Sequence, residues 1–182
     1  MQSVYDGPVR LVLFDVDGVL TNGKLHISKD GEETKTFNVK DGVAVALLQS
    51  HGILCGIMSG KASAALDYRV KQLGFDMALT GCSNKLSTYF NLREKLKLSD
   101  HQVAFVGDDI IDLSVMQQVG LAIAPADAHQ LVIKNAQFIT LTRGGQGVAR
   151  EAAEYILQSA GLDIEEMYQP LLENWEASNV RQ

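Results

Sequence analysis

The fold is decided by the stretch Phe14-Asp15-Val16-Asp17-Gly18-Val19-Leu20-Thr21 and by a later partner, Val106-Gly107-Asp108-Asp109-Ile110-Ile111-Asp112. Each stretch follows a short apolar run that is typical of a buried β-strand. Each therefore places its carboxylates just beyond the carboxyl end of a strand, where open parallel α/β sheets bind their ligands. The sequence predicts one acidic crevice at the ends of two strands.

Five aspartates belong to this crevice: Asp15, Asp17, Asp108, Asp109 and Asp112. Carboxylates that converge repel one another, which raises their pKa values. A divalent cation relieves that repulsion, and hard oxygen ligands suit Mg²⁺. The pattern therefore indicates a Mg²⁺-dependent phosphoryl-transfer site with an aspartate nucleophile.

The composition narrows the choice of partners. The chain has 182 residues, 46% of them apolar and 21% charged, which is ordinary for one globular domain spanning residues 1–182. The formal net charge is −6 and no run of lysines and arginines exists, so we expect no nucleic-acid partner.

No apolar stretch approaches the roughly 18 residues that span a bilayer, and the first residues do not resemble a signal peptide. Cys55 and Cys82 lack the spacing of a metal site, so we expect a reduced, cytoplasmic protein without a membrane partner.

Strand and helix patterns alternate along most of the chain. We expect strands at residues 9–14, 53–58, 77–79, 103–106, 121–124 and 138–141. We expect helices at residues 62–73, 85–96, 112–119, 128–135 and 148–160, and another that Asp41 caps and that runs to about residue 50. Strands that alternate with helices in this way form βαβ units, so the fold class is α/β with a mostly parallel sheet.

Two segments stand outside this alternation. Residues 24–27 and 34–39 flank the turn signal Lys29-Asp30-Gly31 and predict a β-hairpin within residues 23–39. Residues 161–182 form an acidic tail in which Pro170 is expected to interrupt any helix. Trp175 needs burial, either on its own subunit or on a neighbour.

Asp15 and Asp17 stand two residues apart on a loop that leaves a strand, so both can face one small site. One can attack phosphorus and form an aspartyl-phosphate. The other can give a proton to the leaving alkoxide and then take one from water. Gly18 permits a tight turn and a close approach of the backbone.

The second aspartate cluster forms the metal side of the predicted site. Asp108 follows a strand and a glycine, and it can complete the Mg²⁺ ligand set with Asp15 and Asp17. Asp112 lies one helical turn further and, with Asp109, can orient the site from behind the ligands. A helix N-terminus attracts acids for dipole reasons alone, but that accounts for one or two aspartates rather than three.

Phosphate ligands are expected from two further places. Ser59-Gly60-Lys61 ends another predicted strand, where a hydroxyl and exposed backbone N–H groups can bind a phosphoryl oxygen. Lys85 starts a predicted helix, where its charge opposes the helix dipole. It therefore makes more sense as a point-charge ligand for phosphate than as a stabiliser of that helix.

The order DxDGVLT, SGK, Lys85 and GDDxxD on alternating strands resembles the haloacid dehalogenase-type phosphatases, over residues 9–160. The resemblance implies a Rossmann-like three-layer fold with Asp15 as nucleophile and Asp17 as general acid/base. It also implies Mg²⁺ on Asp15, Asp108 and the backbone carbonyl of Asp17. Ser59 and Lys85 would hold the phosphoryl group, and Gly60, Lys61 and Thr21 belong to the same substrate-binding set.

The gaps between these motifs are too short to hold a cap domain. Residues 23–42 and 143–151 further resemble the branch that hydrolyses 3-deoxy-D-manno-octulosonate 8-phosphate for lipopolysaccharide synthesis. That resemblance implies a homotetramer assembled through the hairpins, with tails that reach a neighbouring active site. Lys61 and Lys40 stand where the branch more usually has arginine, so a phosphatase for nine-carbon sugar acids, or one for a broader range of sugar phosphates, stays open. A catalytically idle oligomerisation domain is the remaining alternative.

Overall fold

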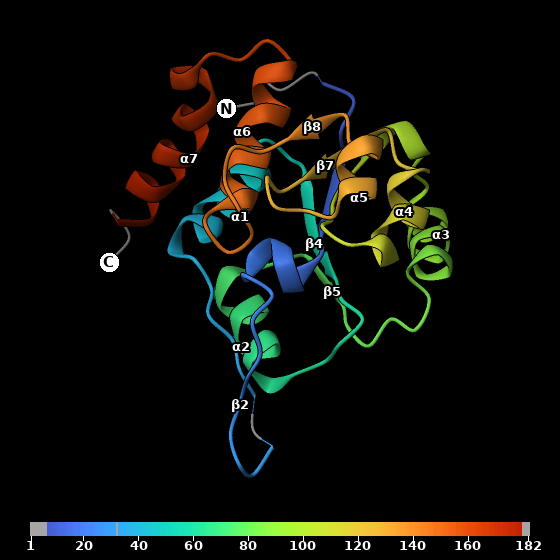
Figure 1. The fold of residues 1–182 in the computed structure, drawn as a ribbon. Helices are drawn as coiled ribbons and strands as arrows, with labels where there is room; N and C mark the ends of the chain where they lie inside the picture. The colour runs from blue at the N-terminus through green and yellow to red at the C-terminus, as the bar shows by residue number, and fades with distance from the viewer. Residues whose placement is uncertain (1–6, 32, 180–182) are drawn as a thin grey trace.

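The protein is described by a computed structural model that covers residues 7–31 and 33–179. Its centre is a six-stranded sheet in the order β5-β4-β1-β6-β7-β8 (Figure 1). Every pairing in this sheet is parallel. The strands are β1 (Leu11–Phe14), β4 (Leu54–Met58), β5 (Met77–Leu79), β6 (Val103–Val106), β7 (Leu121–Ala124) and β8 (Phe138–Ile139). The predicted α/β class is confirmed.

Strand β1 occupies the middle of the sheet because every one of its side chains is apolar and buried. A strand covered on both faces needs such a run. Leu13 pairs with Gly56 of β4 on one side and with Phe105 of β6 on the other. The carboxyl ends of these three strands therefore lie together, and the loops that leave them bring the predicted site residues to one edge of the sheet.

Helices cover both faces of the sheet, which gives the predicted three layers (Figure 1). They are α1 (Val39–Ser50), α2 (Ala64–Leu73), α3 (Lys85–Leu96), α4 (Leu113–Met116), α5 (Gln130–Asn135), α6 (Val148–Ser159) and α7 (Ile164–Asn179). Val12 and Phe14 face one core, shared with α1, α2, α6 and α7. Leu11 and Leu13 face the other core, shared with α3, α4 and α5. The alternation of β1 side chains thus divides the interior into two halves.

The expected hairpin is present but its strands are short. Strand β2 (His26–Ile27) pairs antiparallel with β3 (Glu33–Thr34). The hairpin projects from the body of the molecule below the carboxyl edge of the sheet (Figure 1). Leu25 is 47% exposed and Ile27 is 64% exposed, so little of the subunit's own surface covers this arm.

The start of α1 differs from the prediction. Asn38, rather than Asp41, caps this helix by accepting from the backbone N–H of Lys40 at 3.0 Å. Asp41 lies inside the first turn and is buried. Its Oδ1 accepts from the backbone N–H of Ala149 at 3.2 Å, so it caps α6 instead. Sequence spacing alone did not reveal that the carboxylate serves a different helix.

Other helices and strands also begin or end at residues that differ from the predictions. The helix expected at residues 112–119 is a 3₁₀ turn (Ile110–Asp112) followed by the four residues of α4. Helix α2 begins after Ser63, whose hydroxyl accepts from the backbone N–H of Leu66. Helix α5 begins after His129, whose ring accepts from the backbone N–H of Leu131. Strand β8 ends at Ile139, earlier than expected.

The prediction that Pro170 interrupts the tail helix is wrong. Helix α7 continues through it, although proline in a helix interior costs about 3 kcal/mol. Met167 and Leu171, one turn apart, are buried against the first core, and burying such side chains contributes roughly 2 kcal/mol each.

The side chain of Trp175 is 45% exposed and lines a pocket with Val43 and Leu73, so it lies partly against its own subunit. None of the helices in the described ranges has the length and apolar character needed to cross a membrane.

Candidate active site

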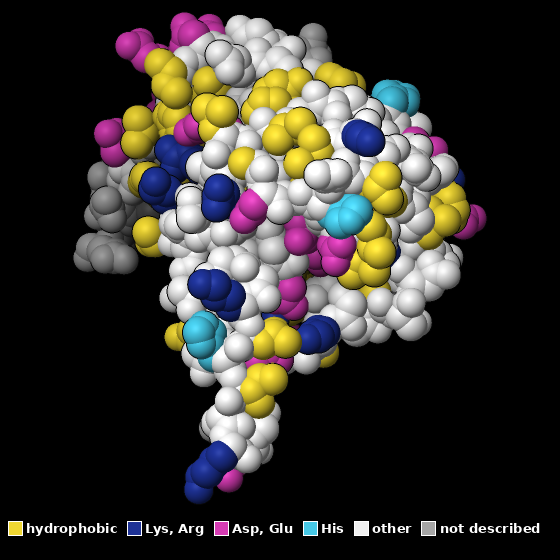
Figure 2. Space-filling view, viewed as in Figure 1, with side chains coloured by type: hydrophobic (Ala, Val, Ile, Leu, Met, Phe, Trp, Pro, Cys, Tyr) yellow, Lys and Arg dark blue, Asp and Glu magenta, His cyan; other side chains and the backbone are white. Residues whose placement is uncertain are grey.

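A cavity of about 290 Å³ opens at the carboxyl edge of the sheet. It is lined by Asp15, Asp17, Gly23, Leu25, Ser59, Gly60, Lys61, Asp108, Asp109 and Ile111. Acidic side chains gather near the middle of the same face in Figure 2, above the root of the hairpin. Seven of the predicted site residues therefore share one cavity. Gly23, Leu25 and Ile111 line it without any sequence signal that would have singled them out.

The loop after β1 makes a short π-type turn over Val16–Leu20. Within it Gly18 has φ +95°, a left-handed conformation that favours glycine. A Cβ added there would lie 1.9 Å from Oδ2 of Asp108. Only glycine lets the two aspartate loops approach so closely, and this contact joins the two halves of the site.

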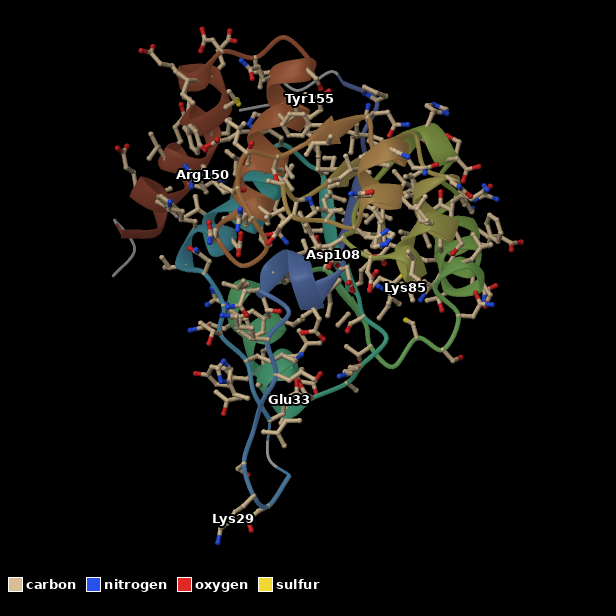
Figure 3. The ribbon with its side chains drawn as sticks, in the orientation of Figure 1. Lys29, Glu33, Lys85, Asp108, Arg150 and Tyr155 are labelled. Atoms are coloured by element: carbon tan, nitrogen blue, oxygen red, sulfur yellow. The ribbon has the colours of Figure 1, made fainter. Side chains whose placement is uncertain are left out.

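Lys85 joins the nucleophile candidate to the second aspartate cluster. Its Nζ lies 2.7 Å from Oδ1 of Asp15 and 2.6 Å from Oδ1 of Asp112, and all three side chains are buried. The other oxygen of Asp112 accepts from the backbone N–H groups of Asp108 and Asp109, at 3.1 and 3.3 Å. Lys85 and Asp108 lie close together at the centre of Figure 3. Asp112 thus fixes both the lysine and the backbone that carries Asp108.

The electrostatics of the site reflect crowded negative charge. Burial, with repulsion from Asp112, raises the pKa of Asp15 to about 6 despite the attraction of Lys85. Burial and repulsion from Asp15, Asp112 and Asp109 raise the pKa of Asp108 to about 8. Burial opposes the charge of Lys85, but Asp15 and Asp112 outweigh it and raise the pKa of that ammonium. The cluster therefore has a deficit of positive charge that Lys85 alone does not fill.

A divalent cation fits this deficit. One carboxylate oxygen from each of Asp15, Asp108 and Asp112 lies within 4.8 Å of the others. Oδ1 of Asp108 is buried and has no hydrogen-bond partner among the described residues. Such an orphaned carboxylate oxygen needs a cation or a proton. The donors are hard oxygens, which suit Mg²⁺.

Asp17 has surroundings that the sequence did not predict. Its Oδ1 accepts from the hydroxyl of Thr21 at 3.3 Å and from Nζ of Lys35 at 2.5 Å. Lys35 comes from the return arm of the hairpin and also lies 2.9 Å from Oε1 of Glu33. No motif marks Lys35, because the contact depends on how the hairpin folds back over the loop after β1.

The remaining predicted residues occupy four different positions. Ser59 is buried at the end of β4, and its hydroxyl accepts from the backbone N–H of Lys61 at 3.2 Å. The Lys61 side chain is exposed at the mouth of the cavity. Thr21 is buried behind Asp17 and is not among the cavity-lining residues. Lys85 and Gly60 also line an adjoining pocket of about 310 Å³ with Ser114.

The glycine-rich loop at residues 143–147 supports the nucleophile loop from outside. The backbone N–H of Gly145 donates to the carbonyl of Val19 at 2.9 Å. A Cβ on Gly144 would lie 2.1 Å from the carbonyl oxygen of Gly18. The backbone N–H of Gly144 donates to Asp127 at 2.9 Å. This packing fixes the turn that carries Asp15 and Asp17.

A parallel α/β sheet with paired aspartates at its carboxyl edge, a bridging buried lysine and a place for a cation defines a class of phosphoryl-transfer hydrolases. The profile of the haloacid dehalogenase-like hydrolases matches residues 80–151. The 3-deoxy-D-manno-octulosonate 8-phosphate phosphatase of Escherichia coli strain K12 is 40% identical over 153 residues, which cover 84% of this chain and 81% of the relative. The chain belongs to the haloacid dehalogenase-like hydrolases, and its relatives there include 3-deoxy-D-manno-octulosonate 8-phosphate phosphatases.

Solved structures agree with this assignment. The 3-deoxy-D-manno-octulosonate 8-phosphate phosphatase of Yersinia pestis superposes with a TM-score of 0.82 at 40% identity, covering 85% of this chain and 83% of that one. The phosphatase of the same name from Moraxella catarrhalis, in complex with a magnesium ion, a phosphate ion and a KDO molecule, has a TM-score of 0.81 at 33% identity. It covers 84% of this chain and 88% of that one. The predicted family resemblance is confirmed.

Proposed function

We propose that this protein is a phosphomonoesterase that hydrolyses 3-deoxy-D-manno-octulosonate 8-phosphate to the free sugar acid and inorganic phosphate. The observation that carries the proposal is the contact of Asp15 with Lys85 beside Asp108, in a chain 40% identical to phosphatases of that substrate. Through its product the reaction would serve lipopolysaccharide synthesis.

The first chemical step is assigned to Asp15. A carboxylate oxygen of Asp15 attacks phosphorus, and the bond between phosphorus and the sugar oxygen breaks with its electron pair on that oxygen. Asp17, 29% exposed and lining the same cavity, gives the sugar oxygen a proton. The product of this step is an aspartyl-phosphate on Asp15 and the free sugar acid.

The second step releases phosphate. A water molecule attacks the phosphorus of the aspartyl-phosphate, Asp17 takes the proton of that water, and the carboxylate of Asp15 departs with its electron pair. Lys85 and the hydroxyl of Ser59 would offset negative charge on the transferred group, because both stand at the edge of the sheet where that group must lie. Asp17 ends the cycle protonated, ready to act again as the acid.

Mg²⁺ is the cofactor of the proposed enzyme. Asp15, Asp108 and the backbone carbonyl of Asp17 would hold it, and Asp112 would orient Asp108 by accepting from the backbone N–H groups of Asp108 and Asp109. The exposed side chain of Asp109 instead accepts from the backbone N–H of Ile110. When bound, the ion neutralises charge on the transferring phosphoryl group and on the converging carboxylates.

Substrate recognition is assigned to the mouth of the cavity. Lys61 is exposed there and can pair with the carboxylate of a sugar acid, although it lacks the bidentate fork of arginine. A phosphatase for a nine-carbon sugar acid 9-phosphate would use the same residues and is the second candidate. Gly23 and Leu25 of the hairpin root complete this rim.

Assembly into a homotetramer is part of the proposal, with the hairpin at residues 23–39 as the contact and residues 161–182 as the tail. The exposed Leu25 and Ile27 support this assembly, because an isolated two-stranded arm is only marginally stable in water and a neighbouring subunit would cover these side chains.

We also place the enzyme in the cytoplasm, where its two cysteines, both free, would stay reduced. Residues 180–182 of the tail lie outside the described residues.

Phosphate release tests the proposed function. The purified enzyme is assayed with Mg²⁺ and with EDTA on 3-deoxy-D-manno-octulosonate 8-phosphate, a nine-carbon sugar-acid phosphate and hexose phosphates. A strong Mg²⁺-dependent preference for the octulosonate is expected. Preference for another phosphate would reject the substrate but keep the chemistry, whereas full activity of Asp15→Asn would reject the nucleophile.

A further inference from the structure

Lys35 is a buried charge on a projecting arm. Its side chain is only 2% exposed, although its neighbours Thr34 and Thr36 are exposed. Removing an ammonium from water is costly unless it is paired. Lys35 has two partners, Oδ1 of Asp17 and Oε1 of Glu33. The hairpin therefore folds back so that its lysine reaches a residue of the catalytic cavity; Glu33 marks the root of the arm in Figure 3 and Lys29 its far end.

The two side-chain donors to Asp17 meet the same oxygen. Lys35 and the hydroxyl of Thr21 both donate to Oδ1, Thr21 from before the hairpin and Lys35 from just after its second strand. A carboxylate held through one oxygen by two donors has a fixed rotation about its terminal bond. The other oxygen, Oδ2, is then the one that can exchange a proton with a ligand in the cavity.

We propose that Lys35 is a positioning residue for the general acid/base: its ammonium, held by Glu33, fixes the Asp17 carboxylate so that Oδ2 faces the leaving oxygen. The inference rests on the proposed role of Asp17 in the phosphatase reaction. Catalytic groups lose much of their effect when their orientation is loose. The hairpin root is thereby part of the active site of its own subunit.

The test compares two substrates in the variant Lys35→Met, which keeps the length of the side chain without its charge. A sugar phosphate has a poor leaving group and needs the proton from Asp17, whereas 4-nitrophenyl phosphate has a good leaving group that needs none. The readout is kcat/KM, which reports transfer to Asp15. We expect a loss of about ten- to hundredfold for the sugar phosphate, a fraction of what a general acid contributes, and less than about threefold for 4-nitrophenyl phosphate.

A double-variant cycle excludes a purely structural role. In an Asp17→Asn background, Lys35→Met should cost less than about a further threefold, because the group that it positions is already lost. Lys29→Met, an exposed lysine of the same hairpin, is the matched control and should keep both values. If Lys35→Met does not fold, Lys35→Arg replaces it, since moving the charge should change the same ratio of the two substrates.

Equal losses on both substrates, full additivity with Asp17→Asn, or the same loss in Lys29→Met would each overturn the proposal. The failure of the proposed function looks different. It would appear in the unmodified enzyme as no release of phosphate from 3-deoxy-D-manno-octulosonate 8-phosphate. The Lys35 comparison can still be run on any alkyl phosphate that the enzyme hydrolyses.

Discussion

Nζ of Lys85 lies 2.7 Å from Oδ1 of Asp15 and shares its charge with Asp112, so a single cation serves two buried carboxylates. Asp108 adds a third carboxylate to the same cluster. When all three carboxylates are ionised, the ammonium of Lys85 leaves two of their negative charges without compensation. A divalent cation closes that deficit, which explains why the site combines a buried lysine with an orphaned oxygen on Asp108.

Replacing Lys85 should damage both stability and catalysis. In Lys85→Met, Asp15 and Asp112 lose their common partner, and breaking such a buried pair typically costs about 3 kcal/mol. We expect urea unfolding in EDTA to show this loss and phosphate release to fall by at least about a hundredfold. Lys61→Met is the control, because that side chain is exposed and should leave the free energy of unfolding unchanged. Similar stability of the two variants would contradict the shared-cation account.

Binding of Mg²⁺ should release protons. The pKa of Asp108, raised to about 8 by burial and neighbouring carboxylates, makes it largely protonated at pH 7 before the ion binds. A metal ligand must be deprotonated, so we expect most of one proton to be released per ion at pH 7 and close to none well above pH 8. Titration calorimetry in buffers of different ionisation enthalpy measures this number. A value near zero at pH 7 would mean either that Asp108 is already ionised before the ion binds or that it does not bind the ion.

The close approach of the two aspartate loops gives a sharp steric test. Gly18→Ala would place a methyl group 1.9 Å from Oδ2 of Asp108, so the loops must separate. We expect activity to fall by at least about a hundredfold and Mg²⁺ affinity to fall with it. Gly31→Ala is the matched control, because Gly31 has a similar positive φ of +80° and an added Cβ there would have no atom within 4 Å. It should cost only about 1 kcal/mol in unfolding free energy and keep the activity of the site.

Much of the site could be predicted because it depends on local rules. An apolar strand followed by acids places those acids at the carboxyl edge of a parallel sheet, and this positioned Asp15 and Asp108 correctly. Lys85 stood out because a lysine opposes the dipole at a helix N-terminus. Lys85 thus conflicts with its local structure, and that conflict indicates a functional role.

Contacts that depend on the path of the chain were not predictable. Lys35 reaches Asp17 only because the hairpin folds back, and Asp41 caps α6 only because α1 and α6 pack side by side. Helix α7 continues through Pro170 because Met167 and Leu171 bury on a core formed by distant segments. Tertiary packing can outweigh a local helix propensity of a few kcal/mol, and the neighbouring sequence gives no signal of that packing.

The buried cap of α6 should make stability depend on pH through Asp41. Burial raises the pKa of Asp41 from 3.8 to about 6, so between these values the folded protein binds more protons here than the unfolded chain. Stability from this residue therefore falls as pH rises from about 4 to 6 and stays constant above.

Asp41→Asn keeps an oxygen that can accept from Ala149 but carries no charge. Relative to the unmodified protein, its free energy of unfolding should gain about 2 kcal/mol between pH 4 and pH 7, after a discount for relaxation of the site. Asp15 and Asp108 titrate in both proteins, so the difference between their urea midpoints isolates Asp41. A difference that stays flat across this range would mean that Asp41 remains charged and is stabilised by groups other than the α6 backbone.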